Sequence, residues 1–345
     1  MNRFAYHRAD SVDHALQLLA SGTAARVIAG GTNLVDLMKY EVERPAALID
    51  ITRLPLSAIE EVNDDQGGQA LRIGALVSNS TLAYDERINA RYPLLASAIL
   101  AGATAQLRNA ASTGGNLLQR TRCYYFYDVA TPCNKRAPGS GCGAIGGVNR
   151  IHAILGASDS CIATHPSDMC VALAALEAVV IVQSAANGER RIPFAELHRL
   201  PGEAPEHDHT LQPDELIVAV ELPASTAGFG VHHTYLKLRD RQSYAFALVS
   251  VAAALEVDGD TIRRARIALG GVAHKPWRVP GAEHRLEGAT VGDAAFNQAA
   301  DALLEGAQGH GDNDFKIELA RRAIRRALQQ AAAGTPQSQV DKRIQ

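Results

Sequence analysis

The first 55 residues contain two kinds of hydrophobic pattern, apolar residues at helical spacing and short continuous apolar runs. Helical spacing of apolar residues over 10–19, behind a polar pair that can cap a helix, predicts a helix. Short apolar runs at 26–29 and 47–51 predict strands, and the stretch 34–42 between them predicts a second helix. We therefore expect residues 1–55 to form the N-terminal α/β part of a larger domain.

Residues 56–223 continue the mixture of strands and helices. Apolar alternation predicts a strand at 71–77, and a strand expected at 215–222 ends at Pro223, which has no N–H to donate to a sheet. The other elements expected here are helices at 80–88, 93–101 and 167–178 and a strand at 179–183. We expect this region to be the second part of the same domain.

A shift in composition at 224–230 marks a linker to a C-terminal unit, expected over 231–335. The pair Asp258-Gly259 separates two apolar stretches, which is a strong signal for a β-hairpin. The elements expected in this unit are strands at 233–239, 250–257 and 262–269 and helices at 293–307 and 313–332. The unit is therefore predicted to be an antiparallel sheet with helices packed against it, and the chain as a whole to have an α+β fold.

Composition and charge narrow the possible functions. The chain has 345 residues, of which 47% are hydrophobic and 21% charged, as in a globular protein with room for two or three domains. A net charge of −3 argues against a nucleic-acid partner. No uncharged apolar run reaches membrane-spanning length, and the N-terminus lacks the apolar core of a signal peptide. We expect no membrane insertion and no export signal on this chain.

Two glycine turns carry the first chemical signal. One follows the strand at 26–29, and the other lies near 112–116. Glycine lets the backbone approach a bulky anion, and hydroxyl and amide side chains add donors around the exposed N–H groups. A tight loop would explain either turn alone, but two turns of this kind favour a grip on one diphosphate. The residues expected there are Arg26, Val27, Ile28, Ala29, Gly30, Gly31, Thr32, Asn33 and Leu34 in the first turn and Asn109, Ser112, Thr113, Gly114, Gly115 and Asn116 in the second.

Four cysteines follow in a stretch for which neither strand nor helix is predicted. They are Cys123, Cys133, Cys142 and Cys161. A long loop inside a compact domain is usually functional or disordered, and a metal centre could tie four thiols together. The C-x2–4-C knuckle typical of zinc is missing, whereas four thiolates at irregular spacing can hold a [4Fe–4S] cluster. Spacing alone leaves disulfides, zinc and an iron–sulfur cluster open.

The helix predicted at 167–178 contains a fifth cysteine. Cys170 lies in its apolar run, where a buried structural thiol is expected. His165, just before the helix, is expected to have a structural role at the start of the helix rather than to bind a metal.

Several motifs together resemble the FAD-binding subunits of the molybdenum hydroxylases, the family of xanthine dehydrogenase and carbon monoxide dehydrogenase. The motifs are Ala29-Gly30-Gly31-Thr32-Asn33, Thr113-Gly114-Gly115-Asn116, Ser167-Asp168, Tyr235-x-Lys237-x-Arg239 and Ala268-Leu269-Gly270-Gly271-Val272-Ala273. The resemblance covers nearly the whole chain. It implies a two-part FAD-binding domain of the vanillyl-alcohol-oxidase type, followed by a C-terminal domain like that of the carbon monoxide dehydrogenase flavoproteins.

The resemblance also assigns roles to residues. It implies that both glycine turns bind the FAD diphosphate, that Asp168 contacts the sugar-like chain of the flavin and that the C-terminal unit covers one side of the site. Lys237, Arg239, Arg241 and Tyr244 could then approach the isoalloxazine. Salt bridges at the surface or between domains are the competing interpretation for these last side chains.

The cysteine stretch departs from most of the family. It resembles two branches that carry an extra [4Fe–4S] cluster, the FAD subunits of bacterial periplasmic aldehyde oxidoreductases and of 4-hydroxybenzoyl-CoA reductases. The sequence of the segments 120–128, 132–136 and 139–142 is most similar to that of the first branch. This implies that the ligands of a [4Fe–4S] cluster are Cys123, Cys133, Cys142 and Cys161.

The implied function is electron transfer in a heterotrimer, with no catalytic residue on this chain. A molybdopterin-binding large subunit would oxidise an aldehyde, a [2Fe–2S] small subunit would relay electrons, and FAD on this chain would pass them to an external acceptor. A signal on a partner could carry the complex to the periplasm; otherwise the complex would be cytoplasmic. The alternatives are a 4-hydroxybenzoyl-CoA reductase-like subunit, a non-catalytic scaffold with zinc-bound or unpaired cysteines, and a free-standing flavin oxidase.

Overall fold

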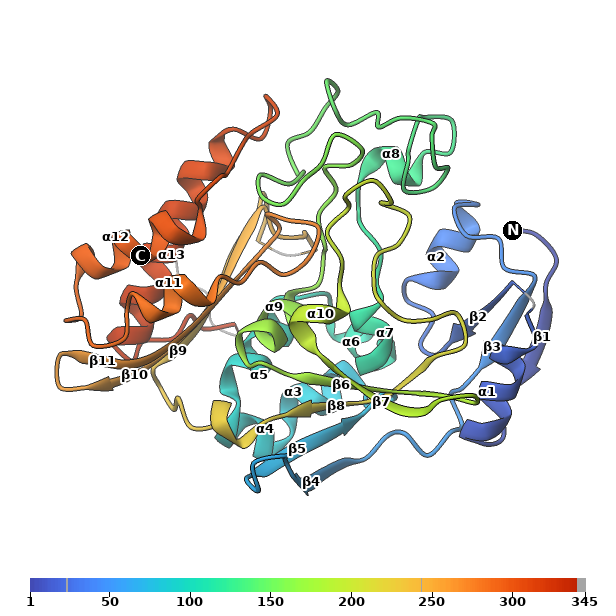
Figure 1. Ribbon diagram of the computed structural model, residues 1–345, viewed down its shortest axis with the longest axis horizontal. Coiled ribbons are helices and arrows are strands. Elements are labelled where there is room, and N and C mark those ends of the chain that lie inside the picture. Colours follow the sequence, from blue (N-terminus) through green and yellow to red (C-terminus); the bar gives the residue numbers. More distant parts are fainter. Residues whose placement is uncertain (23, 243, 340–345) are drawn as a thin grey trace.

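A computed structural model describes residues 1–22, 24–242 and 244–339 and arranges them around three β-sheets (Figure 1). Each sheet is built from a separate stretch of the chain. The elements expected from the sequence therefore fall into three groups, which the following paragraphs take in chain order.

The first sheet is parallel and has the strand order β1-β3-β2. Its strands are β1 (Ala5–Arg8), β2 (Ala25–Ile28) and β3 (Ala47–Asp50), and its helices are α1 (Val12–Ala20) and α2 (Leu34–Lys39). The Ser11 hydroxyl accepts a hydrogen bond from the N–H of His14, so the expected helix cap is confirmed. The edge strand β1 was not expected, because all of its side chains are exposed and no apolar pattern marks it.

The second sheet is antiparallel and has the order β4-β5-β8-β6-β7. Its strands are β4 (Ile59–Asn63), β5 (Gln69–Gly74), β6 (Val179–Ser184), β7 (Gly188–Pro193) and β8 (Leu216–Leu222). Every residue of the central strand β8 is buried, which explains why all of them except Glu221 are apolar. The outer strands β4 and β7 are largely exposed and polar, and the sequence pattern missed both.

Helices pack on this second sheet and share its apolar core. They include α3 (Asn79–Tyr84), α4 (Glu86–Arg91), α5 (Pro93–Ala101), α9 (Asp168–Ala175) and α10 (Phe194–Leu197). The single helix expected at 80–88 is wrong. Asp85 ends α3, and its carboxylate caps α4 by accepting hydrogen bonds from the N–H groups of Arg87 and Ile88.

The third sheet is antiparallel and has the order β11-β10-β9. Its strands are β9 (His233–Leu238), β10 (Val249–Asp258) and β11 (Thr261–Gly270), and they are followed by α11 (Pro280–His284), α12 (Asp293–Leu303) and α13 (Phe315–Ala332). The predicted hairpin is confirmed, with Gly259 in the left-handed region at φ 62°. The expected linker contains the 3-10 helix η1 (Ala224–Thr226).

Both faces of β10 are buried, because the third sheet lies between two layers of helices. Ala252 and Ala254 belong to the core shared with α5 and α9, while Val251 and Leu255 pack in the core that contains α13. The third sheet therefore contacts the second group of elements directly, through one continuous apolar core.

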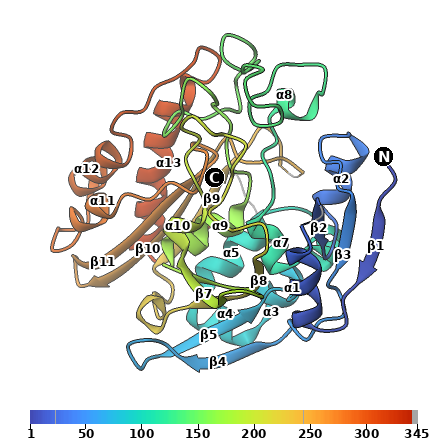
Figure 2. The same ribbon diagram turned by 45° about the vertical axis from the view of Figure 1, so that its right-hand side comes forward.

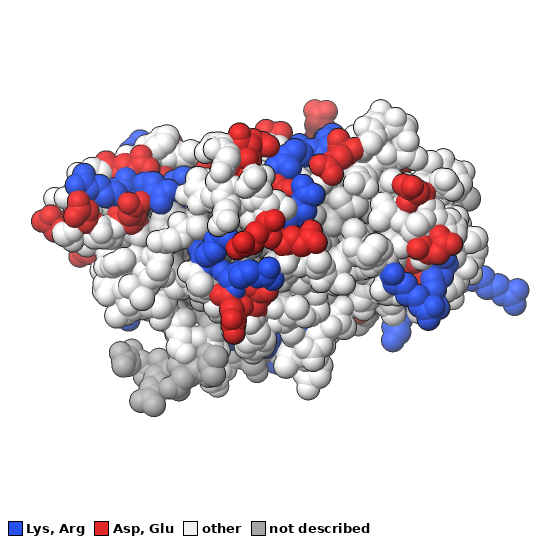
Figure 3. Space-filling model, turned by 90° about the horizontal axis from the view of Figure 1, so that it is seen from below, with Lys and Arg blue, Asp and Glu red and all other residues white. Residues whose placement is uncertain are grey.

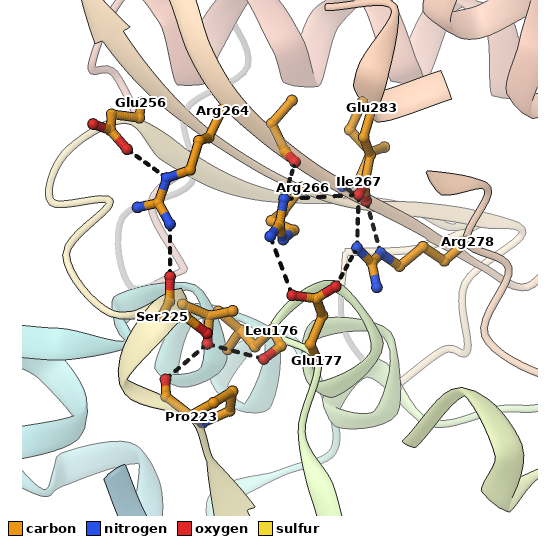
Figure 4. A network of polar contacts seen from close by, with 12 residues as sticks. Leu176, Glu177, Pro223, Ser225, Glu256, Arg264, Arg266, Ile267, Arg278 and Glu283 are labelled. Atoms are coloured by element: carbon orange, nitrogen blue, oxygen red, sulfur yellow. Dashed lines mark hydrogen bonds and ion pairs between the residues drawn. The ribbon is translucent and has the colours of Figure 1, made fainter. Parts of the chain in front are cut away.

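Ion pairs reinforce this contact at the end of α9 (Figure 4). Glu177 accepts hydrogen bonds from Arg266 at 3.1 Å and from Arg278 at 2.9 Å, and Arg278 also donates to Glu283 at 2.7 Å. Both arginines come from the C-terminal elements, so Glu177 joins the two parts of the chain.

Charges of both signs lie beside one another on the lower face of the molecule (Figure 3). This mixture fits the small net charge of the sequence. Across the described part of the chain, the apolar stretches within helices are too short to span a bilayer.

Candidate functional site

The two glycine turns meet in space. A Cβ atom on Gly30 would lie 1.7 Å from the carbonyl oxygen of Ala110, so the first turn runs directly against the chain that leads into the second. The Asn33 side chain holds the two segments together, because its Oδ1 accepts a hydrogen bond of 2.9 Å from the N–H of Arg120. The structure thus brings together two stretches that are about eighty residues apart, as a shared diphosphate site requires.

The second turn is more helical than expected. It spans the end of α6 (Ala105–Ala110) and the whole of α7 (Thr113–Leu117). Ser112 caps α7 by accepting a hydrogen bond of 3.3 Å from the N–H of Gly115. An added Cβ on Gly114 would lie 3.1 Å from the Cβ of Ala75, so packing of α7 against the end of β5 accounts for this glycine.

The expected diphosphate residues divide into exposed and engaged groups. Arg26, Gly30, Thr32, Asn109 and Gly115 are exposed. The remaining members are built into the protein. In the first turn, Val27 and Ile28 lie in β2, Ala29 follows it, Gly31 adopts φ 69° and Leu34 opens α2. In the second turn, Ser112 and Gly114 are buried, the Thr113 hydroxyl donates to the Val77 carbonyl, and the Asn116 amide donates to Asn79 Oδ1.

Asp168 occupies the first position of α9 and is fixed from two sides. Its Oδ1 accepts a hydrogen bond of 2.7 Å from the Tyr235 hydroxyl, and its Oδ2 accepts one of 2.7 Å from the Lys237 ammonium. The Lys237 side chain is only 2% exposed. Burial raises the pKa of Tyr235 well above its ordinary value, so the phenol stays protonated and can donate. Lys237 therefore forms an ion pair between the two parts of the chain. A salt bridge between domains was one of the two interpretations expected for this side chain.

A large cavity opens beside Asp168, between the start of α9 and the third sheet. It encloses about 960 Å³ of space not filled by atoms, including its opening to solvent. Its walls include Arg122, Tyr124, Asp168, Arg241, Phe246 and Gly270. Tyr244 does not line this cavity: it is exposed at φ 53°, and its ring lies under the Arg241 guanidinium, 5.7 Å from the ring centroid.

The four loop cysteines converge on one smaller cavity, the cysteine cavity. It encloses about 280 Å³ of space not filled by atoms, including its opening. Cys133 and Cys142 lie on backbone segments paired by a β-bridge, and Cys161 pairs with Ser158. Cys123, Cys133 and Cys161 are buried, and all four thiols are free. The disulfide alternative is therefore not realised. The loop also contains α8 (Tyr124–Tyr127), a short helix that was not expected.

The loop that carries these cysteines lies at the top of the molecule, between α2 and α13 (Figure 2). Its sulfur atoms are spread too widely for one ion. Within residues 1–22, 24–242 and 244–339, no three of the four sulfurs lie within 4.8 Å of one another. Ligands of one tetrahedral zinc ion at 2.3 Å would be about 3.8 Å apart.

Burial controls the protonation of two of these thiols. It raises the pKa of Cys123 to about 12 and that of Cys161 to about 11. Thiols of this kind stay protonated at neutral pH unless a bound cation stabilises the thiolates. The raised pKa values of Cys123 and Cys161 therefore disfavour nucleophilic chemistry at these two thiols.

The cysteine cavity and the large cavity share a wall that is one residue thick. Arg122 and Tyr124 line the large cavity, whereas Cys123 between them lines the cysteine cavity. The same alternation holds for Ile151 with His152 and for Thr164 with Ala163. A group in one cavity is therefore adjacent to a group in the other.

Cys170 lies apart from both cavities and is fully buried in α9, which confirms the expected buried thiol. Its sulfur lies within 4.8 Å of a ring nitrogen of His165 and of His198. One nitrogen of each ring is engaged: His165 Nδ1 accepts from the N–H of Ser167, and His198 Nε2 contacts the Leu117 carbonyl at 2.8 Å. These contacts fix the start of α9, and the structural role expected for His165 stays a prediction.

Buried charges anchor the cysteine loop to the segment around Asp208. This carboxylate accepts hydrogen bonds from Lys135, whose side chain is 1% exposed, and from Arg120 at 2.8 Å. Burial acts to raise the pKa of Asp208, but the charges of Lys135 and Arg120 outweigh it and hold this pKa well below its usual range.

We expect Asp208→Asn to lower the free energy of unfolding by about 3–5 kcal/mol at neutral pH, because the buried charge of Lys135 loses its partner. The stabilisation by Asp208 is present above the unfolded-state pKa of about 3.9 and is lost as the pH falls towards the lower pKa of the folded state. The difference in urea midpoint between wild type and variant should therefore shrink as the pH falls from about 5 to about 2. A difference that stays constant over this range would contradict the assignment.

Comparison with known proteins agrees with this architecture. Residues 2–225 match the FAD binding domain in molybdopterin dehydrogenase, and residues 233–331 match the CO dehydrogenase flavoprotein C-terminal domain. The chain is 49% identical over 337 residues to the aldehyde oxidoreductase FAD-binding subunit PaoB of Escherichia coli (strain K12), a match that covers 96% of this chain and 99% of that one.

More distant relatives cover the chain equally well. It is 30% identical to the 6-hydroxypseudooxynicotine dehydrogenase complex subunit alpha of Paenarthrobacter nicotinovorans, over 95% of this chain and 94% of that one. Among solved structures, a chain of carbon monoxide dehydrogenase from Hydrogenophaga pseudoflava superimposes with a TM-score of 0.74 at 28% identity, covering 96% of this chain and 98% of that chain.

Proposed function

The chain belongs to the FAD-binding subunits of the molybdenum hydroxylase family, and on this premise we propose that it is the electron-transfer subunit of an aldehyde oxidoreductase complex. Its flavin would receive electrons from [2Fe–2S] clusters of a partner and deliver them to an external acceptor. The 49% identity to an aldehyde oxidoreductase subunit supports the aldehyde as the substrate of the complex over a 4-hydroxybenzoyl-CoA type of substrate.

The residues of the glycine turns and the large cavity fit FAD. Gly30, Thr32 and Gly115 are exposed where the two turns meet, and this favours a diphosphate there. Asp168 lines the large cavity with a carboxylate that can accept hydrogen bonds from the hydroxyls of the flavin side chain. Lys237 would orient this carboxylate rather than contact the ring, and Tyr244 remains an expected contact. Bound FAD supplies the exchange between one-electron and two-electron transfer.

Cys123, Cys133, Cys142 and Cys161 would hold a [4Fe–4S] cluster. The observation that carries this part of the proposal is the convergence of four unpaired thiols on one cavity, with sulfurs too far apart for a single zinc ion. The same observation argues against a scaffold with isolated thiols. The wall shared with the large cavity would put the cluster next to the flavin.

The partners would be a molybdopterin-binding large subunit and a [2Fe–2S] small subunit in a heterotrimer. Relatives are described as medium chains or as subunits of complexes, which supports a multi-subunit assembly. The complex would reach the periplasm by an export signal on a partner subunit.

An absorption spectrum before and after dithionite, with iron and acid-labile sulfide measured on the same sample, tests this function. We expect flavin bands above a broad iron–sulfur shoulder that bleaches on reduction, with about four irons per chain. Flavin without iron would remove the cluster from the proposal. A colourless protein, once reconstitution with FAD, iron and sulfide has also failed, would contradict both cofactors and favour a scaffold.

A further inference from the structure

His152 lies in the cysteine loop between Cys142 and Cys161, and its ring points at a sulfur. Its Nε2 is 3.1 Å from Cys123 Sγ. The side chain is buried, with the residue only 1% exposed, and it lines the cysteine cavity together with the four cysteines. Nothing in the cysteine spacing marks this histidine, so it could not be assigned to the cysteine cavity from local sequence.

The C-terminal helix α13 fixes the position of His152. The backbone carbonyl of His152 accepts hydrogen bonds from the Lys316 ammonium at 2.7 Å and from the Asn313 amide at 3.2 Å. Lys316 and Asn313 are themselves fully buried, and Lys316 also donates to the Gly271 carbonyl. The backbone of His152 is thus held by the start of α13.

The hydrogen-bonding state of the ring follows from its surroundings. A cysteine bound to a metal is a thiolate, which can only accept a hydrogen bond, so the Nε2 that faces it must donate. His152 Nδ1 is buried without a partner among the described residues, which agrees with a neutral ring that carries its proton on Nε2. His152 is therefore arranged as an N–H donor to Cys123.

We propose that His152 is a positioning residue that donates an N–H···S hydrogen bond to the Cys123 ligand and raises the reduction potential of the iron–sulfur cluster. This inference rests on the [4Fe–4S] cluster of the proposed function. One electron from an external reductant adds one negative charge to the cluster and its ligating sulfurs. A donor at one of these sulfurs stabilises the reduced state more than the oxidised state, and hydrogen bonds to the sulfurs are an established control on such potentials.

A redox titration of the full chain, monitored by electron paramagnetic resonance with dithionite as the reductant, tests this role. We expect His152→Ala to keep its iron and sulfide but to shift the cluster midpoint to a more negative potential. At the wild-type midpoint, the ratio of reduced to oxidised cluster should fall about tenfold, which corresponds to about 59 mV for one electron. His152→Gln, which retains an N–H donor, should recover part of the shift.

His233→Ala is the matched control. His233 is also a buried histidine, but it lies in β9 and its Nδ1 contacts the Gly230 carbonyl at 2.7 Å. Its replacement removes a buried imidazole without removing a donor to sulfur, so the cluster midpoint should stay at the wild-type value. An equal shift in both variants would overturn the inference.

A second measurement covers the case in which His152→Ala loses its cluster. In wild-type protein labelled with ¹⁵N-histidine, the reduced cluster should show a weak nitrogen coupling that disappears in His152→Gln. No coupling, or one as large as that of an iron-bound nitrogen, would overturn the hydrogen bond. Wild-type protein without iron would overturn the cluster and this inference together, whereas four irons with an unmoved midpoint in His152→Ala would overturn this inference alone.

Discussion

Cys133→Ser is expected to reduce the iron content from about four atoms per chain to less than about one, while the flavin is retained. Cys133 lines the cysteine cavity, is buried, and pairs with Cys142 through a β-bridge. Serine is a much poorer ligand for iron than a thiolate, and a cluster with three cysteines loses its fixed attachment. Iron, acid-labile sulfide and FAD should be measured on the same sample.

The matched control is Cys170→Ser. It makes the same chemical change at a buried cysteine, but Cys170 lies in α9 and does not line the cysteine cavity. Iron should stay at the wild-type level in this control. An unchanged iron content and an unchanged cluster signal in Cys133→Ser would contradict the ligand assignment.

Gly30→Ala is expected to have the opposite pattern, with FAD lost and iron retained. The added Cβ would lie 1.7 Å from the Ala110 carbonyl oxygen, an overlap with backbone that no side-chain rotation can relieve. The two glycine turns must separate, and the diphosphate site is lost with them. We expect at least about a tenfold lower affinity for FAD, because a loss of only about 1.4 kcal/mol has this effect. Titration of the FAD-free chain with FAD gives the dissociation constant.

Gly281→Ala is a suitable control for this substitution. Gly281 lies in α11, and a Cβ there would meet no atom within 4 Å. Alanine is favoured over glycine in a helix, so FAD binding and stability should be unchanged or slightly improved. Gly114→Val is less informative, because the added side chain would disturb the packing on Ala75 rather than the diphosphate itself. Wild-type affinity in Gly30→Ala would contradict the location of the site.

The two variants together separate the cofactors. Cys133→Ser should lose iron and keep flavin, and Gly30→Ala should lose flavin and keep iron. Loss of both cofactors from either variant would indicate general unfolding, which far-ultraviolet circular dichroism detects independently. The pattern therefore distinguishes two specific sites from one unstable protein.

Local sequence was enough to predict the helices and strands that have the clearest hydrophobic patterns. The apolar runs of β3, β8 and β10, the Asp258-Gly259 hairpin and the capped helix α1 depend on neighbours within a few residues, so periodicity and turn chemistry were enough to predict them. The two glycine turns and the four cysteines could be singled out for the same reason, because each motif is a short pattern. The boundaries expected for the three parts of the chain, 1–55, 56–223 and 231–335, stay predictions.

The tertiary structure decided what depends on residues far apart in the chain. The edge strands β1, β4 and β7 exist through pairing with their neighbours and carry little apolar pattern of their own. Packing brings the Lys237 ammonium to the Asp168 carboxylate, and it brings the His152 ring to the Cys123 sulfur. Such contacts join segments whose separation along the chain leaves no local signal, because the core and its buried hydrogen bonds fix them only once the sheets have assembled.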